Sequence, residues 1–409
     1  MRICVITSGH LATCPRMLKA ADAFAEAGHD VRLVSAQFID WAAEADQEIS
    51  RKRSHIWSTI DYRWRTDPLR YWQTGLRFHA ARRWVRVVGP ERVDIATLAA
   101  ANGRAARDLM DLALAEPADL YYGGTCGGLA VTALAARRAG VPYGLDLEDF
   151  HEGELEYGPA WDHWRSLLHR LQREVLRDAA FVTAGSAAIA ARYEKAYDVS
   201  VLPIHNTFSL PPYVPDPEPS TAGCLRLYWF SQTVGAGRGL EDVVRAIGLA
   251  GIRAELHVRG VAQVEYLARL RQLASVKLSV HVHDPAPPDR MVELSLPYDA
   301  GLSPEEGRSV NRQLCLSNKA LTYILAGLAV VLADTAGQRP LADDLGEGAL
   351  RYRPGDIVSL AQGLRRWAED RSRLRRARQA AWQAARLRWN WEDRREKWAL
   401  IDAVEAAFQ

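Results

Sequence analysis

Short apolar runs of strand length alternate along this chain with longer segments of helical periodicity. Residues 2–7 are mostly apolar and predict a buried strand, and residues 30–35 predict a second one. Between them, residues 15–27 predict a helix with Pro15 at its first position, where proline is favoured. A strand–helix–strand unit nearly always belongs to a parallel sheet with a right-handed crossover. The chain therefore begins as an α/β fold.

The same alternation continues to residue 353, with two interruptions. Further strands are predicted at 118–124, 141–147, 180–186, 199–206, 225–231, 254–260, 276–282, 298–303, 328–333 and 349–353. Further helices are predicted up to 139, from about 187, and at 239–249, 264–274, 288–295 and 391–407. Residues 210–223 interrupt the pattern, because they hold five prolines and little apolar content. Two α/β runs joined by such a linker predict two doubly wound domains, with ligands at the carboxyl ends of the strands and in a cleft between the domains.

Composition narrows the class of protein. The chain is 48% hydrophobic and carries a net charge of only +2, which argues against a nucleic-acid binder, because such proteins usually contain a strongly basic domain. The 5 cysteines are scattered, without a CxxC pair or a nearby histidine at metal spacing. We therefore expect reduced thiols in a cytosolic protein and no metal site. The first residues enter a strand directly and no run reaches the ~18–20 apolar residues of a spanning helix, so neither a signal peptide nor a membrane span is predicted.

One segment breaks the alternation by its charge. Residues 51–92 contain eleven Lys/Arg against three Asp/Glu, interleaved with aromatic side chains. Residues 72–88 can be drawn as a basic amphipathic helix, whose face could rest on an anionic membrane surface or grip an anionic acceptor. The alternative is an ordinary helix whose aromatic side chains pack on the sheet while its arginines stay solvated.

The apolar segment of residues 315–334 carries polar residues near its N-terminal end. Ser317 is a good N-cap, residues 318–326 predict a helix, Gly327 ends it, and a buried strand follows.

On that helix Asn318, Lys319 and Thr322 are spaced so that they share one edge. A helix N-terminus favours phosphate and Lys319 adds a full charge, which predicts phosphate binding. A capped helix with a solvated lysine is the simpler alternative.

A glycine-rich loop in the same domain supports a phosphate site. Residues 229–240 follow a predicted strand and open a helix, with three glycines, Arg238, and the polar residues Gln232 and Thr233. Backbone amides of such loops approach a diphosphate, and Arg238 supplies charge. The segment is neither a G-x-G-x-x-G fingerprint nor a P-loop, so it becomes informative only together with Lys319.

The first domain offers a different chemistry. Residues 146–154 end a strand with five acidic residues and His151. They could bind sugar hydroxyls, supply a base or hold a metal, although one turn offers few oxygen ligands for a metal. A solvated acidic loop with a structural histidine is the alternative. His151, Asp149 and Glu148 are the best candidates for contact with the reacting centre.

A loop after the first strand is expected at the same edge. Residues 8–10, which include Gly9 and His10, predict a tight glycine turn. Arg16 lies in the first turn of the next helix, where the helix dipole disfavours a cation that lacks an anionic partner. The chain has no G-x-S-x-G motif of a serine hydrolase.

Taken together, these segments resemble the family-four glycosyltransferases of the GT-B fold over almost the whole chain. The likeness rests on residues 6–10, 15–35, 143–154, 201–208, 228–247, 298–307, 317–338 and 353–364. It implies transfer of a sugar from a nucleotide-sugar donor to an acceptor, with retained anomeric configuration and without an essential metal or a cofactor other than the nucleotide sugar as co-substrate. The implied domains are an acceptor-side domain over 1–210, a linker over 211–223, a donor-binding domain over 224–390 and a helix over 391–409 that returns to the first domain.

The resemblance also assigns residues. Arg238 matches the family's lysine before glycine, a diphosphate ligand; His151 matches the histidine beside the donor sugar; Gly9 matches the glycine turn over the diphosphate. Gln232 stands where the family keeps an arginine, and Thr322 stands where it places the second glutamate of a Glu-x7-Glu pattern that holds the ribose.

The remaining assignments concern the donor, the acceptor and the reaction. Leu314 replaces the first glutamate of that pattern, so the loop residues Glu305, Glu306 and Asn311 are alternative sugar contacts. The catalytic candidates are His151, Asp149, Glu148, Arg238 and Lys319. The donor-binding candidates are Gly9, His10, Gln232, Thr233, Gly237, Glu305, Asn311, Ser317, Asn318 and Thr322. The acceptor-binding candidates are Arg16 and Glu152.

Three functions remain open from the sequence. The first is a retaining glycosyltransferase that works by front-face displacement, in which the leaving diphosphate accepts the acceptor's proton. The second is a GT-B nucleotide-sugar epimerase that uses the carboxylates of residues 146–154. The third is a non-catalytic binding or scaffold protein, because the glutamate pair is missing. The expected partners are a nucleotide-sugar donor and an acceptor that is lipid-linked, a glycan or a small molecule, with peripheral contact at the inner face of the membrane.

Overall fold

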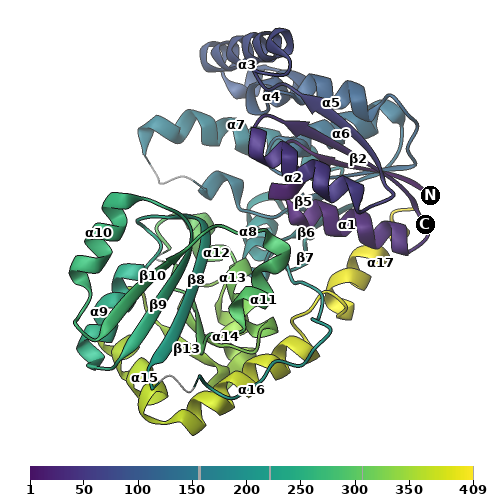
Figure 1. The fold of residues 1–409 in the computed structure, drawn as a ribbon. Helices are drawn as coiled ribbons and strands as arrows, with labels where there is room; N and C mark the ends of the chain where they lie inside the picture. Colours follow the sequence, from purple (N-terminus) through teal and green to yellow (C-terminus); the bar gives the residue numbers. More distant parts are fainter. Residues whose placement is uncertain (155–157, 221–222, 306, 409) are drawn as a thin grey trace. The chain divides into compact units, whose positions relative to one another are not determined.

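The structure, a computed structural model, describes residues 1–154, 158–220, 223–305 and 307–408. The chain forms two compact units, Met1–His205 with Lys397–Gln409, and Asn206–Glu396. Each unit is built on one parallel β-sheet covered by helices, as the alternating pattern predicts (Figure 1). The predicted α/β class is therefore confirmed.

The first unit is built on a sheet whose described strands run in the order β3-β2-β1-β4-β5-β6-β7. They are β1 (Arg2–Thr7), β2 (Asp30–Gln37), β3 (Ile56–Asp61), β4 (Leu120–Gly124), β5 (Tyr143–Leu147), β6 (Phe181–Ala184) and β7 (Leu202–Pro203). The helices are α1 (Pro15–Glu26), α2 (Asp40–Arg51), α3 (Pro68–Val88), α4 (Ile95–Asn102), α5 (Ala106–Ala113), α6 (Gly128–Ala139), α7 (Pro159–Leu176), α8 (Ala187–Tyr197) and α17 (Ala399–Ala406). The chain direction across the sheet reverses between the neighbours β1 and β4, and ligands bind at such switch points.

The second unit has a sheet whose described strands run in the order β10-β9-β8-β11-β12-β13. They are β8 (Leu225–Val234), β9 (Ala254–Ala262), β10 (Leu278–His283), β11 (Ala300–Ser303), β12 (Ala329–Ala333) and β13 (Ala349–Tyr352). The helices are α9 (Leu240–Ala250), α10 (Val264–Leu273), α11 (Met291–Ser295), α12 (Val310–Leu314), α13 (Asn318–Leu325), α14 (Arg339–Leu345), α15 (Ile357–Glu369) and α16 (Arg371–Leu387). Here the switch point lies between β8 and β11.

The core of the second unit lies on both faces of its sheet. Alternate residues of a strand face opposite sides, so Leu227 and Trp229 of β8 join the cluster under α9 while Tyr228 joins the cluster around α13. All three side chains are fully buried. Burial on both faces explains why these strands are nearly continuous apolar runs.

Several predicted elements differ from those observed. The strand predicted at 199–206 is only Leu202–Pro203, because Pro203 has no N–H for a ladder and the strand lies at the sheet edge. The helix predicted over 391–407 is instead a π-helical turn at Arg394–Trp398 followed by α17. Gly327 ends α13 as predicted, in the left-handed region at φ 66°. Ser317 stands at the N-cap, but its side chain makes no capping hydrogen bond.

The basic aromatic segment contains β3, which the sequence did not predict, and the long helix α3, which packs against α4 (Figure 1). Trp72 and Trp84 of α3 are 63% and 57% exposed. The interpretation in which the aromatic side chains pack on the sheet is therefore wrong for these two tryptophans. No helix in the described part of the chain is both long and apolar enough to cross a membrane.

Candidate active site

The loop after β1 is held by a buried histidine. His10 is 0% exposed; its Nδ1 lies 3.0 Å from Oδ2 of Asp46, and its Nε2 accepts from the backbone N–H groups of Phe38 and Ile39, both at 3.0 Å. Both ring nitrogens are therefore engaged inside the protein, and His10 fixes the path of the loop. Gly9 does not have a positive φ, and an added Cβ would meet only Phe38 at 3.9 Å, so the fold itself does not require glycine there.

Arg16 finds the anionic partner that its place at a helix start demands. Its Nε and Nη2 donate to Asp146 at 2.8 and 2.6 Å, and its Nη1 donates to the carbonyl of Ile204 at 2.6 Å. Burial by itself would lower the pKa of Arg16, but the Asp146 carboxylate outweighs it and raises the pKa. Arg16 is only 5% exposed, so the structure gives it an internal ion pair that ties α1 to β5.

The carboxyl end of β5 presents Glu148 in an environment that favours its neutral form. Burial raises the pKa of the Glu148 carboxyl to about 7, against the attraction of Arg16. Asp149 and Asp146 add to the rise, because neighbouring carboxylates disfavour a further negative charge. A carboxyl that titrates near neutral pH can either accept or donate a proton, which suits contact with a hydroxyl group.

His151 lies in the turn His151–Gly153. One of its ring nitrogens contacts a carboxylate, and the other has no partner among the described residues. Its Nδ1 lies 2.6 Å from Oε1 of Glu154, and its backbone N–H donates to the Tyr193 hydroxyl at 3.2 Å. Its Nε2 is buried and finds no hydrogen-bond partner among the described residues. Burial opposes the charged form, yet the Glu154 carboxylate raises the pKa of the imidazole. A buried polar atom without a partner is rare in folded proteins, which makes this nitrogen a candidate contact for a ligand.

Glu152 belongs to a neighbouring polar cluster. The Tyr197 hydroxyl donates to its Oε1, and His169 Nδ1 lies 3.5 Å from the same oxygen. Burial raises the pKa of Glu152, opposed by His169. Glu152, which was predicted to bind the acceptor, therefore already has one partner on α7 and one on α8.

In the second unit, a glycine holds the loop that carries Arg238. Gly239 has φ 76°, and a Cβ on it would lie 1.8 Å from the carbonyl oxygen of Pro304, just after β11. Only glycine permits this approach. The loop after β8 is thereby locked onto the loop after β11, on either side of the switch point.

Arginines converge on this junction. Arg312 donates from Nη1 to the carbonyl of Gly237 at 3.0 Å. A Cβ on Gly237 would lie 3.8 Å from Nη1 of Arg312 and 3.9 Å from Nη1 of Arg308. Burial lowers the pKa of the neighbouring Arg238, and the charge of Arg312 lowers it further, while Glu305 opposes both. Like charges gathered in this way are relieved by binding an anion.

Arg308 and Arg312 are not among the residues predicted from the sequence. The signal was present: Arg308 follows Gly307 in the loop after the buried strand β11, and Arg312 lies on the short helix α12 that comes next. Loops at the carboxyl ends of neighbouring parallel strands meet, so cations in the two loops could have been counted together.

Lys319 is not a solvated charge. Its Nζ lies 2.7 Å from Oε1 of Glu305 and 3.5 Å from Oγ of Ser317, and both members of the ion pair are largely buried. Burial would raise the pKa of Glu305, but Lys319 more than compensates and lowers it. The polar edge predicted for α13 does not include Thr322, which is 3% exposed and donates to the carbonyl of Asn318 at 2.9 Å.

The other predicted site residues differ in the solvent exposure of their side chains. Gln232 and Thr233, near the end of β8, are exposed, and so is Asn318 at the first position of α13. Asn311 is 8% exposed, on α12. Glu306 lies outside the described residues. The structure thus brings Gly237, Arg238 and Glu305 together with Lys319. It buries Thr322 in the second unit.

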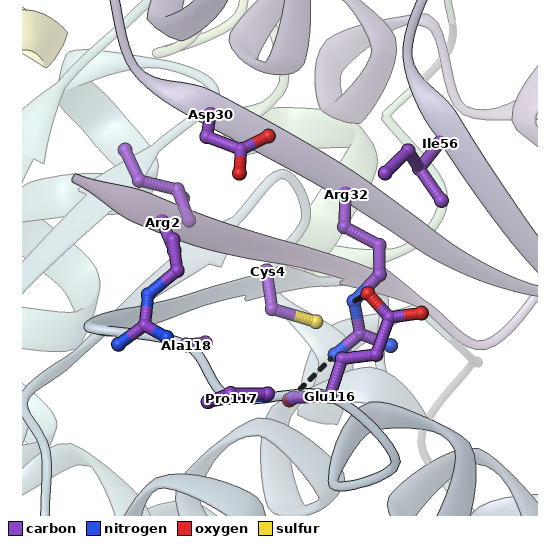
Figure 2. Close-up of a pocket in the computed structure, with 9 residues that line it drawn as sticks. Arg2, Cys4, Asp30, Arg32, Ile56, Glu116, Pro117 and Ala118 are labelled. Atoms are coloured by element: carbon purple, nitrogen blue, oxygen red, sulfur yellow. Dashed lines mark hydrogen bonds and ion pairs between the residues drawn. The ribbon is translucent and has the colours of Figure 1, made fainter.

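The cavity in Figure 2 lies elsewhere. It has a volume of about 140 Å³ and is lined by residues at the starts of β1 to β4, including Arg2, Cys4, Arg32 and Glu116. Burial raises the pKa of the Cys4 thiol to about 12, so it is unreactive at neutral pH. Ligands of parallel sheets bind at the opposite, carboxyl edge, and the cavity is therefore no candidate for the active site.

Comparison with known proteins defines the class. Residues 15–207 match the family described as glycosyl transferase 4-like domain. The solved structure of HepE of Anabaena, in complex with UDP and glucose, is 15% identical with a TM-score of 0.66, over 100% of this chain and 99% of that one. Sucrose-phosphate synthase of Thermosynechococcus elongatus is 13% identical with a TM-score of 0.69, over 100% of both chains. No curated protein sequence matches significantly.

These findings confirm the expected fold and class. At these identities the structural likeness shows the fold, which is the GT-B fold over the full length of the chain. Residues 15–207 form a glycosyl transferase 4-like domain. The family match over residues 15–207 and the GT-B fold of the whole chain together support a glycosyltransferase.

Proposed function

We propose that this glycosyltransferase uses a UDP-sugar donor and retains the anomeric configuration, without an essential metal. The observation that carries the proposal is the pairing of Arg238 with Arg312 at the glycine loop, which supplies two guanidinium groups for a diphosphate. The choice of UDP is supported by HepE, which has been solved with UDP and with UDP-glucose.

The donor would bind on the second unit. Arg238 and Arg312 hold the diphosphate, and the N–H groups at the start of α13 add the partial positive charge of the helix end. Arg312 then takes the place of the arginine that Gln232 replaces. Lys319 keeps Glu305 charged and oriented at 2.7 Å, which leaves that carboxylate to accept hydroxyl groups of the sugar. Thr322 supports the helix from inside instead of replacing the ribose-binding glutamate.

The acceptor would bind on the first unit. Glu148, half-buried with its pKa raised to about 7 by burial, accepts the hydrogen bond of the acceptor hydroxyl. The Nε2 of His151 offers a second contact for a hydroxyl group there. The acceptor oxygen forms a bond to the anomeric carbon, the bond from that carbon to the diphosphate breaks, and the acceptor's proton passes to the departing diphosphate oxygen.

A nucleotide panel tests this function. We expect calorimetry to detect binding of UDP and UDP-sugars to the full chain, with much weaker binding of ADP and GDP. Arg238→Ala with Arg312→Ala should abolish UDP binding. No binding of any nucleotide would reject a donor site. Once a donor and acceptor are found, the proton NMR coupling constant of the anomeric centre tests retention, and turnover after extensive EDTA treatment tests independence of metal.

We also propose that α3 rests on an anionic membrane surface at the cytoplasmic side. The support is that Trp72 and Trp84 are more than half exposed on a helix rich in arginine. Trp72→Ala with Trp84→Ala should reduce sedimentation with phosphatidylglycerol vesicles, whereas Trp161→Ala on α7, which removes another exposed tryptophan, should not. Equal sedimentation with neutral phosphatidylcholine vesicles would contradict the electrostatic part of this proposal.

A further inference from the structure

A cluster of imidazoles lies on the edge of the second sheet, away from the loops that carry Arg238. Glu255 and His257 lie two residues apart on β9, and His281 and His283 lie two residues apart on β10. His281 is the registered partner of His257 in the parallel ladder. Because side chains alternate between faces, these four share one face of the two strands.

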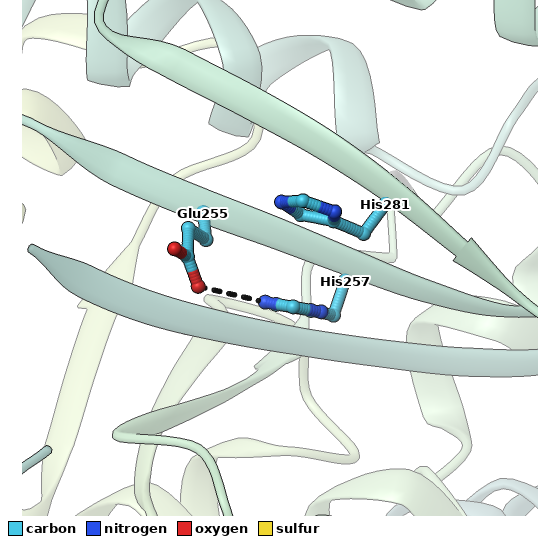
Figure 3. A group of neighbouring side chains, drawn as sticks. All are labelled: Glu255, His257 and His281. Atoms are coloured by element: carbon cyan, nitrogen blue, oxygen red, sulfur yellow. Dashed lines mark hydrogen bonds and ion pairs between the residues drawn. The ribbon is translucent and has the colours of Figure 1, made fainter. Parts of the chain in front are cut away.

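The other face of β9 is apolar, in contrast to the face that carries the histidines. Ala254, Leu256 and Val258 pack in the core, as expected for a buried parallel strand. On the face in question, the rings of His257 and His281 are stacked with centroids 4.6 Å apart and planes at 15° (Figure 3). On this partly exposed face at the sheet edge, three histidines and a glutamate lie side by side.

Hydrogen bonds orient the central histidine. The Nε2 of His257 lies 3.1 Å from Oε2 of Glu255, as Figure 3 shows, and its Nδ1 lies 3.0 Å from Nε2 of His283. An imidazole that ligates a metal through one nitrogen usually donates a hydrogen bond from the other. His283 can accept that bond, which leaves Nε2 of His257 and the carboxylate directed at a common point.

The spacing fits a transition metal. Nitrogen and oxygen ligands at about 2.0–2.1 Å in a tetrahedral site lie roughly 3.3 Å from each other, close to the 3.1 Å between His257 and Glu255. Ligand atoms of Glu255, His257 and His281 all lie within 4.8 Å of one another, and the exposed His281 ring would turn out of its stack on His257 to direct a nitrogen at the metal. Arg226 donates from Nε to the same Oε2 of Glu255 at 3.1 Å, and the metal would displace this contact.

We propose that Glu255, His257 and His281 bind one divalent transition-metal ion, with His283 as the residue that positions His257. Imidazole and carboxylate ligands fit Zn²⁺ best among the metals commonly available to proteins. Because β10 is the edge strand of the described sheet, the metal joins this strand to β9 and stabilises the edge.

Titration of the metal-free full chain tests the proposal. The protein, without an affinity tag and treated with EDTA, is titrated with Zn²⁺ in a calorimeter, and with Co²⁺ while the visible spectrum is recorded. We expect one ion per chain, an intense tetrahedral Co²⁺ absorption, and a higher Tm with Zn²⁺. His281→Gln and Glu255→Gln should each weaken binding at least tenfold, since each removes a ligand.

The matched control is His79→Gln, which removes an exposed histidine on α3 and should leave binding unchanged. His281 is itself exposed, so its replacement should preserve the fold, and circular dichroism checks this. Failure of Zn²⁺ to bind, or binding that survives both ligand substitutions, would overturn the proposal. Because the assay needs no nucleotide, neither result bears on the proposed transferase function.

Discussion

The carboxyl edges of the two sheets both hold arginine, but they hold it differently. In the first unit Arg16 is buried, and all three nitrogens of its guanidinium donate, to Asp146 and to the carbonyl of Ile204. What this edge leaves for a ligand is the Glu148 carboxyl, whose pKa burial raises to about 7, and a nitrogen of His151. Such groups are suited to form hydrogen bonds with uncharged hydroxyl groups of a ligand.

In the second unit, neighbouring arginines repel each other electrostatically. Arg312 contributes, after burial, to the lowered pKa of Arg238, and Glu305 is engaged by Lys319. Repulsion of this kind is tolerated where an anion binds, because the ligand supplies the missing charge. The same residue type is therefore structural at one edge and a ligand-binding group at the other. The predictions below test that difference.

The largest expected effect is on stability in the first unit. Asp146→Ala leaves Arg16 buried without its partner and should lower the free energy of unfolding by about 3–5 kcal/mol. Urea denaturation measures this. Asp119→Ala breaks the exposed pair with Arg2 and should cost below about 1 kcal/mol. Equal losses in the two variants would show that the buried pair is not structural.

The second effect is on turnover. Arg238→Ala and Arg312→Ala should each lower the rate of UDP release from the donor by about 10²–10³-fold, because each removes charge stabilisation of the leaving group. Stability should change little. Arg245→Ala, on the exposed side of α9, is the matched control. If the control loses as much activity, the cluster has no special role.

The third effect depends on pH. Burial raises the folded-state pKa of Glu148 from 4.5 to about 7, so its contribution to stability is present below pH 4.5 and is lost as the pH rises through 7. Glu148→Gln should therefore raise the free energy of unfolding by on the order of 2 kcal/mol at about pH 8 and change it little near pH 4. Urea denaturation at both values measures this. A gain at acid pH instead would contradict the assigned shift.

The smallest effect concerns Thr322. Thr322→Val keeps the shape and removes the hydrogen bond to the carbonyl of Asn318, which should cost about 1 kcal/mol. UDP affinity should be unchanged, because the hydroxyl is used inside the helix. A tenfold loss of affinity by calorimetry would instead place Thr322 at the ribose.

Local patterns predicted most of the architecture. Apolar runs gave β1, β8 and β12, and Pro15 and Gly327 marked a helix start and a helix end, because these signals depend on neighbours in the chain. β3 was missed since its residues Ile56–Asp61 are half-exposed and carry no clear alternation. Polar residues at strand ends drew attention to Arg238 and His151, whose roles stay predictions.

What the sequence by itself determined is the class of fold, the loops at the carboxyl ends of the strands and the kinds of side chain there. Only the tertiary structure decided which of them are partners. Lys319 is paired with Glu305, fourteen positions away, and Arg16 with Asp146, 130 positions away. Arg312 reaches the glycine loop, and His257 meets His281, only because strands distant in sequence are neighbours in the sheet. Pairing of charges depends on distances in space, which local periodicity does not encode.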